Sequence, residues 1–169
     1  MADSGDWRPR LVAIANYQFG RGAGDAVFAD PIDRVTRSAS GRPKQVIAPR
    51  GRIVTLGTDG RFTLGYAGGR RLREALPHPA YRVIVGDESA PYVADGRNAF
   101  AKFVLDADPE IRGGDEVLVL QRVGADPADH ALVGVGRAAI DAAAMADFET
   151  GVAVEIREGV DEFHDAGTD

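Results

Sequence analysis

The sequence predicts an α+β protein, mainly β, in which a small α+β domain is followed by a small β-barrel. Three observations favour this fold class. Short runs that alternate apolar and polar residues recur over residues 34–66 and 82–157, which is typical of strands. Asp-Gly and Pro-x-Gly sequences separate several of these runs, as they do in β-hairpins. Pro77 and Pro79 interrupt the chain between the two halves and mark the expected domain boundary.

The predicted domain organisation has four parts, and a chain of 169 residues suffices for two small domains. Residues 1–8 lack periodicity and are expected to be a disordered start. Residues 9–78 form the first domain, and residues 81–158 form the second. The chain is acidic and without periodicity over residues 159–169, which are therefore expected to be a tail.

The first domain begins with apolar residues at helical spacing, which predicts a helix from Arg10 onward. Its apolar positions are Leu11, Ile14, Ala15 and Phe19. A glycine-rich turn over residues 20–24 then leads into a second short helix that begins near Asp25.

Four strands are expected next, over residues 34–37, 44–48, 52–56 and 61–66. A short basic helix over residues 67–76 follows them and carries three arginines, Arg70, Arg71 and Arg73. Pro77 stops this helix, because proline lacks the N–H group that would continue it.

The predicted order in the second domain is strand, helix, three strands, helix, strand. The strands are expected over residues 82–85, around Phe100, over 117–120, over 131–138 and over 152–157. Ser89 and Pro91 suit the start of the first helix, which ends at Gly96. Asp141 is the expected N-cap of the second helix, which runs to about Phe148.

Six spaced motifs of the second half occur together in a known family. They are Tyr81 to Val85, Glu88 to Val93, Gly96 to Val104, Asp115 to Val119, Gly134 to Ala138 and Gly151 to Val154. In this set and order they resemble an archaeal PUA domain, an RNA-binding pseudo-barrel that is appended to RNA-modifying enzymes. The resemblance implies a PUA-type pseudo-barrel that binds RNA.

The first half carries a second set of motifs. They are Asn16 to Gly22, Ser40 to Arg42, and Gly60 to Leu64 continuing to Leu72. They resemble the small α+β domain that precedes PUA in archaeal tRNA-guanine transglycosylase and archaeosine synthase. In that family the catalytic barrel lies N-terminal to these domains, and this chain is expected to have no room for it. The resemblance therefore implies tRNA binding in support of a tRNA-modifying enzyme supplied in trans.

In the family, the PUA domain binds the acceptor-stem end of tRNA through its first helix, the following strand and the last strand. Carried over to this sequence, the implied contacts are Arg97, Asn98, Phe100, Lys102, Arg137 and Arg157. Arg97 and Lys102 can neutralise phosphates, and Asn98 can donate to a base edge or ribose. By strand alternation Phe100 shares a face with Lys102. Phe100 would either stack on an unpaired base or join the core, and the core is favoured for it as for Phe103.

The charge of the chain is divided unevenly. Residues 1–80 contain 13 Lys and Arg against 7 Asp and Glu, a net of +6, whereas residues 81–169 contain 7 against 19, a net of −12. Such asymmetry indicates a polyanionic partner for the basic half. Its candidate basic face consists of seven residues, Arg34, Arg37, Arg42, Lys44, Arg70, Arg71 and Arg73, among which Arg42, Lys44 and Arg71 are the predicted phosphate contacts. The alternative is a solvated basic surface that balances the acidic half.

Composition and spacing exclude several other classes of protein. The chain has no cysteine, its three histidines lack ligand spacing, and its Gly20-Arg21-Gly22 sequence lacks the third glycine of a dinucleotide loop. We therefore expect no metal, no cofactor, no catalytic residue and no enzymatic activity of its own. No apolar run reaches the roughly 20 residues of a membrane span, so we expect a cytoplasmic protein without a membrane partner. Arginine predominance and abundant carboxylates are typical of a GC-rich, salt-adapted organism.

Two functions remain open from the sequence. The first is a non-catalytic RNA-binding protein that docks tRNA for a modifying enzyme. The second is a protein-interaction or structural module that has lost RNA binding, which the acidic second half favours because carboxylates repel phosphates.

Overall fold

In the computed structural model, residues 7–161 are described, and the chain divides into two compact units between Leu76 and Pro77. Each unit has its own sheet and is described separately below. The α+β class with a small helix-and-sheet region before a pseudo-barrel, predicted from the sequence, is confirmed. Residues 1–6 and 162–169, which include most of the predicted disordered start and tail, lie outside the described residues.

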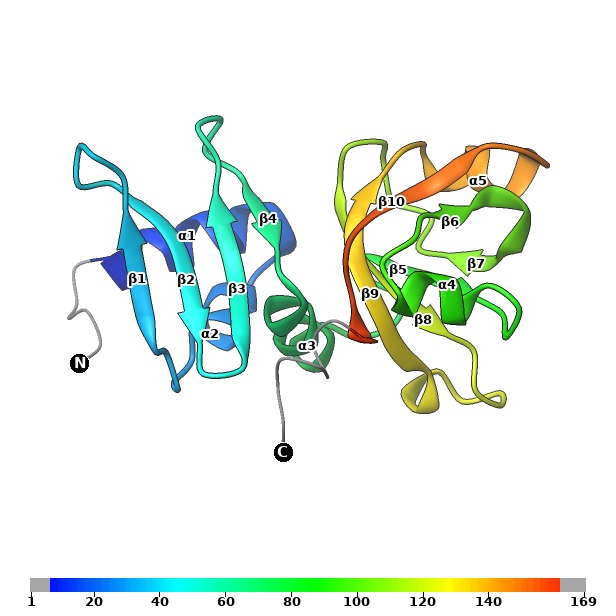
Figure 1. Ribbon diagram of the computed structural model, residues 1–169, viewed down its shortest axis with the longest axis horizontal. Coiled ribbons are helices and arrows are strands. Elements are labelled where there is room, and N and C mark those ends of the chain that lie inside the picture. The colour runs from blue at the N-terminus through cyan, green and yellow to red at the C-terminus, as the bar shows by residue number, and fades with distance from the viewer. Residues whose placement is uncertain (1–6, 162–169) are drawn as a thin grey trace. The chain divides into compact units, whose positions relative to one another are not determined.

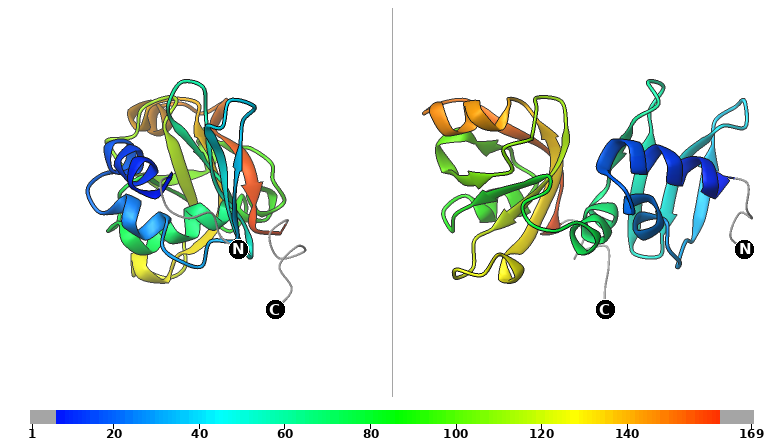
Figure 2. Two further views of the ribbon diagram at one scale, coloured as in Figure 1. Left: turned by 90° about the vertical axis from the view of Figure 1, so that its left-hand side faces the viewer. Right: turned by 180° about the vertical axis from the view of Figure 1, so that it is seen from behind.

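The first unit is a four-stranded antiparallel sheet with helices on one face (Figures 1 and 2). Its elements are α1 (Trp7–Phe19), α2 (Ala23–Val27), β1 (Arg34–Arg37), β2 (Pro43–Ala48), β3 (Gly51–Leu56), β4 (Phe62–Leu64) and α3 (Tyr66–Ala75). The strands follow one another in chain order, β1-β2-β3-β4. Tight turns suffice for this order, because each strand pairs with its neighbour in the sequence.

Helix α1 buries every fourth residue, from Trp7 through Leu11 and Ala15 to Phe19. Trp7 packs edge-on against Phe28, with their ring centroids 5.8 Å apart. The helix therefore begins three residues before the predicted start at Arg10, because Trp7 anchors its first turn in the core. Residues 7 and 8, which were expected to be disordered, therefore lie in α1.

Two amide side chains of α1 complete the first unit. Gln18 bonds both backbone groups of Phe62, with its Oε1 accepting from the N–H at 2.8 Å and its Nε2 donating to the carbonyl at 2.9 Å. Asn16 Oδ1 accepts from the Gly24 N–H at 2.7 Å. Backbone groups of β4 and α2 that would otherwise lack partners are thus satisfied by α1.

The second unit is a six-stranded sheet in the order β6-β10-β9-β8-β5-β7, in which only β5 and β8 are parallel. Its elements are β5 (Arg82–Val85), α4 (Ala90–Ala94), β6 (Ala99–Phe100), the 3₁₀ turn η1 (Ala101–Phe103), β7 (Val104–Ala107), β8 (Glu116–Gln121), the 3₁₀ turn η2 (Pro127–Asp129), β9 (Ala131–Ala138), α5 (Ala142–Asp147) and β10 (Val152–Gly159). The two end strands, β6 and β7, are joined by η1 alone, so the sheet is nearly closed into a pseudo-barrel (Figure 1).

Two details of the second unit differ from the sequence prediction. The single strand expected around Phe100 is two strands, β6 and β7, separated by η1. The Ala101 N–H still donates to the Gly151 carbonyl at 2.9 Å, and the chain leaves the β10 edge at this residue. Strand β10 extends to Gly159, the residue at which the acidic tail was expected to begin. Gly159 is buried against the backbone of α4, where its added Cβ would lie 2.2 Å from the Ala94 carbonyl oxygen.

Glycine permits the close packing of β9 against β10. A Cβ added at Gly136 would lie 2.1 Å from the Glu155 carbonyl oxygen, far inside contact distance. The lack of a side chain at Gly136 thus allows the two backbones to approach closely. The interior that they help to close is filled mainly by valine and alanine, including Val83, Val119 and Val154.

Candidate nucleic-acid interface

The segment between α4 and η1 is shaped by Gly96. Its φ of +95° is in the left-handed region, which ends α4 at little steric cost only for glycine. The N–H of Arg97 then donates to the Tyr92 carbonyl at 2.9 Å, which closes the turn. The next residues leave this turn along the surface of the barrel.

Asn98 attaches this segment to the last strand. Its Oδ1 accepts from the Ile156 N–H at 3.0 Å, and β6 then pairs with β10, with Ala99 opposite Val154 and Phe100 opposite Val152. The helix end, β6 and β10 are therefore held side by side. These are the three elements that the family resemblance implies for RNA contact.

Side chains alternate along this segment as the sequence predicts. Ala99 and Ala101 are buried, whereas Phe100 and Lys102 point outward, and Phe100 is 45% exposed. Phe100 therefore does not join the core, contrary to the favoured expectation. Phe103 is only half-buried and lies outside the core cluster, with the Lys102 ammonium 5.0 Å from its ring centroid, so its expected core role is also corrected. Ala99 and Ala101 occupy the interior instead.

We call the exposed residues Arg97, Asn98, Phe100 and Lys102 the β6 strip. Arg97 lies 5.9 Å from the Tyr92 ring and 3.7 Å from an Asp95 carboxylate oxygen, and both charged side chains are mostly exposed. An exposed pair at this distance contributes little, so a phosphate can compete for the guanidinium. The strip offers two exposed cations, an exposed amide and an exposed aromatic ring within six consecutive residues.

Arg137 and Arg157, the other two predicted contacts in this unit, are paired with carboxylates. Arg137 lies 3.2 Å from Glu155 on the neighbouring strand, and both side chains are more than half exposed. Arg157 makes a two-pronged pair with Glu116, at 2.5 and 2.9 Å, and the Glu116 side chain is only 4% exposed. Arg157 is therefore committed to neutralising a buried carboxylate.

The predicted contacts of the first unit fall into different environments. Lys44 is exposed on β2, and Arg42 is half-buried with its guanidinium donating to the Gly57 carbonyl. Arg71 donates to the carbonyls of Val27, Ala29 and Pro31, the segment that connects α2 to β1. Partial burial lowers the pKa of Arg71, with opposing carboxylates as a smaller effect. Arg71 thus stabilises this connection through its hydrogen bonds to the backbone.

The fold also brings together residues that sequence spacing did not single out. His78 and His130 lie edge to face with ring centroids 6.4 Å apart, beside Arg122 in a pocket of about 430 Å³. Tyr17 on α1 is 95% exposed. Within residues 7–161 no group of three or more His, Asp or Glu side chains is arranged to hold a metal ion, and no helix there is long and apolar enough to cross a bilayer.

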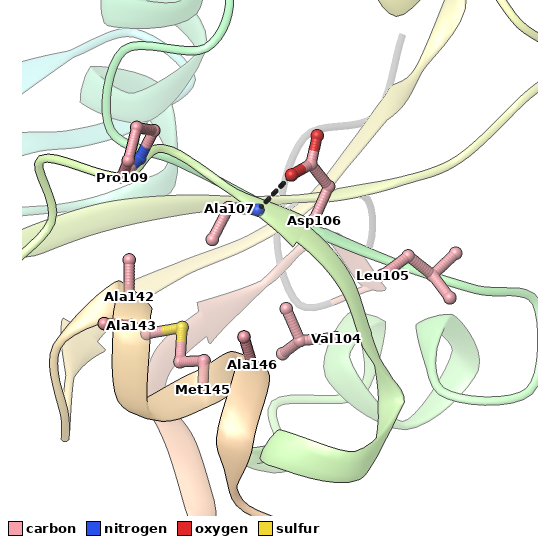
Figure 3. Close-up of a pocket in the computed structure, with 9 residues that line it drawn as sticks. All are labelled: Val104, Leu105, Asp106, Ala107, Pro109, Ala142, Ala143, Met145 and Ala146. Atoms are coloured by element: carbon pink, nitrogen blue, oxygen red, sulfur yellow. Dashed lines mark hydrogen bonds between the residues drawn. The ribbon is translucent and has the colours of Figure 1, made fainter.

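A separate apolar groove of about 290 Å³ lies between β7 and α5 (Figure 3). Val104 and Leu105 line it from the strand, and Met145 lines it from the helix. Among the described residues that line it, Asp106 is the one that carries a charge. The groove contains no residue of the β6 strip.

Comparison with known families assigns the two units to known domains. Residues 81–160 match the PUA domain, and residues 9–79 match the patch-forming domain C2 of tRNA-guanine transglycosylase. The chain is therefore a PUA-domain protein that belongs with the C2-plus-PUA region of the archaeal tRNA-guanine transglycosylases. Neither match is to a catalytic domain.

Individual relatives agree with this assignment. The chain is 39% identical over 160 residues to a tRNA-guanine(15) transglycosylase of Thermococcus kodakarensis, a match that covers 94% of this chain and 26% of the relative. It is 42% identical over 153 residues to the corresponding protein of Pyrococcus furiosus, covering 90% and 25%. The chain thus spans about a quarter of the length of these curated relatives.

Two solved structures share the fold. A hypothetical protein from Pyrococcus horikoshii superposes with a TM-score of 0.67 at 16% identity, covering 95% of both chains. A conserved PUA domain protein from Thermoplasma acidophilum superposes with a TM-score of 0.59 at 18% identity, covering 90% of this chain and 87% of that one. Identities this low support the architecture alone.

Proposed function

We propose that this protein is a non-catalytic RNA-binding module that docks the acceptor-stem end of tRNA for a modifying enzyme supplied in trans. The observation that carries the proposal is the β6 strip, where Arg97, Asn98, Phe100 and Lys102 are all exposed within six consecutive residues of a PUA domain. Cations position phosphates, and an exposed aromatic ring stacks on an unpaired base. The named relatives modify tRNA, which supports tRNA as the RNA.

The test is a gel-shift titration of the full chain with tRNA that carries or lacks its terminal CCA. We expect binding that weakens with salt and is tighter when the CCA is present, because Phe100 can stack only on an unpaired base. Lys102→Ala should lower the salt slope by about 0.7–0.9, the value of one phosphate contact. The absence of a shift at any salt concentration would exclude RNA binding.

Arg122→Ala is the matched control for Lys102→Ala. Arg122 is an exposed cation of the same unit, but it lies in the pocket beside His78 and His130, outside the β6 strip. It should leave the salt slope and the CCA preference unchanged. Equal effects of the two substitutions would mean that only net charge matters, and Lys102 would lose its assigned role.

The second candidate function is a protein-interaction module without RNA binding. Residues 77–161 carry 7 basic and 16 acidic residues, a net of −9, and Arg137 and Arg157 are already paired with carboxylates. The apolar groove between β7 and α5 would then be the contact surface (Figure 3). Leu105→Ser should abolish co-purification with a transglycosylase-like subunit if this candidate is correct, and it should not affect tRNA binding.

A further inference from the structure

The pocket beside His78 and His130 brings several segments of the second unit together. Its volume of about 430 Å³ lies within the range of roughly 300–1,000 Å³ that is typical of small-molecule sites. Ile84 lines it from β5, Asp106 from β7, and Arg122 from the end of β8. The loop between β8 and β9 contributes most of the remaining lining, which includes His130. We call this cavity the His130 pocket.

The loop wall of the His130 pocket is held by hydrogen bonds within the loop. The Val123 N–H donates to His130 Nδ1 at 3.1 Å, and Asp126 Oδ1 accepts from the Ala128 N–H at 3.0 Å at the start of η2. His130 is only 6% exposed, so its ring is a fixed part of the wall. Because Nδ1 accepts a hydrogen bond, the ring proton lies on Nε2 and the imidazole is neutral in this arrangement. The loop therefore presents a preformed surface.

Two opposite charges line the pocket without pairing. Arg122 and Asp106 are both exposed, and within residues 7–161 neither of them belongs to an ion pair. Asp106 Oδ1 accepts from the Ala107 N–H at 3.0 Å, which leaves Oδ2 for a ligand. Figure 3 shows that this carboxylate points away from Met145 and the apolar groove. The pocket thus offers guanidinium donors from β8 and carboxylate acceptors from β7.

This pattern of charge favours an uncharged ligand. A simple anion would meet the Asp106 carboxylate, and a simple cation would meet the Arg122 guanidinium. Asp126 and Asp129 are exposed on the same loop, and residues 77–161 contain 7 basic and 16 acidic residues, a net of −9, so a phosphate group is disfavoured further. A neutral molecule that presents acceptors on one edge and donors on another satisfies both charged side chains.

We infer that the His130 pocket binds an uncharged purine, as the free base or nucleoside, and that guanine is the purine that fits it best. Guanine has two adjacent acceptors, O6 and N7, which a guanidinium bonds together. Its ring N–H and its amino group donate side by side, which suits the two oxygens of a carboxylate.

The other lining residues suit a flat, largely apolar ring. The imidazole of His78 is exposed and offers a face on which a base stacks. Ile84 and Pro127 add apolar surface. The site contains no residue of the β6 strip, and the inference does not depend on the proposed tRNA-docking function.

The first test is a titration of the full chain with guanosine and with inosine, which lacks the amino group. Guanosine should bind about tenfold more tightly than inosine and shift the ¹⁵N–¹H signals of Gly124 and Ala125. Asp106→Asn should remove this preference, because an amide has one acceptor oxygen in place of two. Glu110→Gln is the matched control, since it neutralises an exposed carboxylate of the same unit outside the pocket. The inference is wrong if guanosine does not bind, or if the two substitutions have equal effects.

The second test separates a free purine from a phosphate and from RNA. Guanosine monophosphate should bind no more tightly than guanosine, because its phosphate adds repulsion from the carboxylates. Tighter binding of the monophosphate would make the pocket an anion site and overturn the inference. Saturating guanosine should leave the tRNA affinity of the wild type unchanged, and competition between the two would identify a guanine of the RNA as the occupant instead of a free purine. If guanosine binds and tRNA does not, only the proposed docking function fails.

Discussion

Replacing Arg157 with alanine should destabilise the second unit rather than merely remove an RNA contact. The substitution leaves the Glu116 carboxylate, only 4% exposed, without its two-pronged partner. Breaking a buried pair costs about 3–5 kcal/mol, and we take about 3 because the Arg157 side chain is itself 29% exposed to water. For a unit of this size, that loss lowers the melting temperature by about 12 °C or more.

Native-state hydrogen exchange is the suitable assay, because it reports on each unit separately. Amide protons of β8, β9 and β10 should exchange about 100-fold faster in Arg157→Ala, while those of the first unit should not change. Arg137→Ala is a matched control, since the Arg137–Glu155 pair is more than half exposed and is worth at most about 1 kcal/mol. The combined change Arg157→Met and Glu116→Leu should restore most of the stability, because it removes both charges.

The reasoning is refuted if Arg157→Ala costs no more stability than Arg137→Ala. In that case the Glu116 carboxylate is solvated or re-paired once Arg157 is gone. The outcome also determines how binding data are interpreted, because a loss of RNA affinity in an unfolded variant gives no information about contact.

Three further predictions concern stability. Gly136→Ala should destabilise the second unit by more than about 3 kcal/mol in urea unfolding, because the added Cβ would lie 2.1 Å from the Glu155 carbonyl oxygen. The control Gly113→Ala should cost under about 1 kcal/mol, because the atom nearest to its Cβ lies at 3.5 Å. Similar costs for the two substitutions would contradict the packing argument. Arg71→Met should lower the stability of the first unit by about 2 kcal/mol and leave the salt slope of tRNA binding unchanged, because the Arg71 guanidinium bonds backbone carbonyls. A reduced salt slope in this variant would show that Arg71 contacts a phosphate. Burial raises the pKa of Tyr66 from 10.0 to about 12, so the unfolded chain ionises first and the first unit should lose about 1.4 kcal/mol of stability per pH unit between pH 10 and 12. Absorbance at 295 nm should still rise near pH 12 as Tyr66 ionises, and a titration of the folded protein that is complete near pH 10 would refute this.

Much of the fold could be predicted from the sequence because its signals are local. Alternation and turn residues located every strand of the first sheet, and helical spacing located α1. The same alternation predicted which residues around Phe100 lie outside the core, since Phe100 and Lys102 are exposed and Ala99 and Ala101 are buried, although Lys102 lies in η1 and not in a strand. Such features depend only on neighbours two to four residues away.

The state of each charged side chain could not be predicted, because its partner is distant in the sequence. Arg157 and Glu116 are 41 residues apart, and Arg71 reaches carbonyls 40 to 44 residues away. Both arginines resemble phosphate contacts in the sequence, whereas in the fold they stabilise structure.

The hydrogen bond between Asn98 and β10 restricts what the β6 strip can recognise. Because Asn98 Oδ1 already accepts from the Ile156 N–H, one of its two lone pairs is occupied, and the side chain offers a ligand two amide N–H groups against one remaining lone pair. Arg97 and Lys102 are donors without acceptors. Donors therefore outnumber acceptors in the strip, which favours phosphate, ribose and carbonyl oxygens over exocyclic amines as partners. Discrimination between bases would then follow mainly the positions of their acceptors.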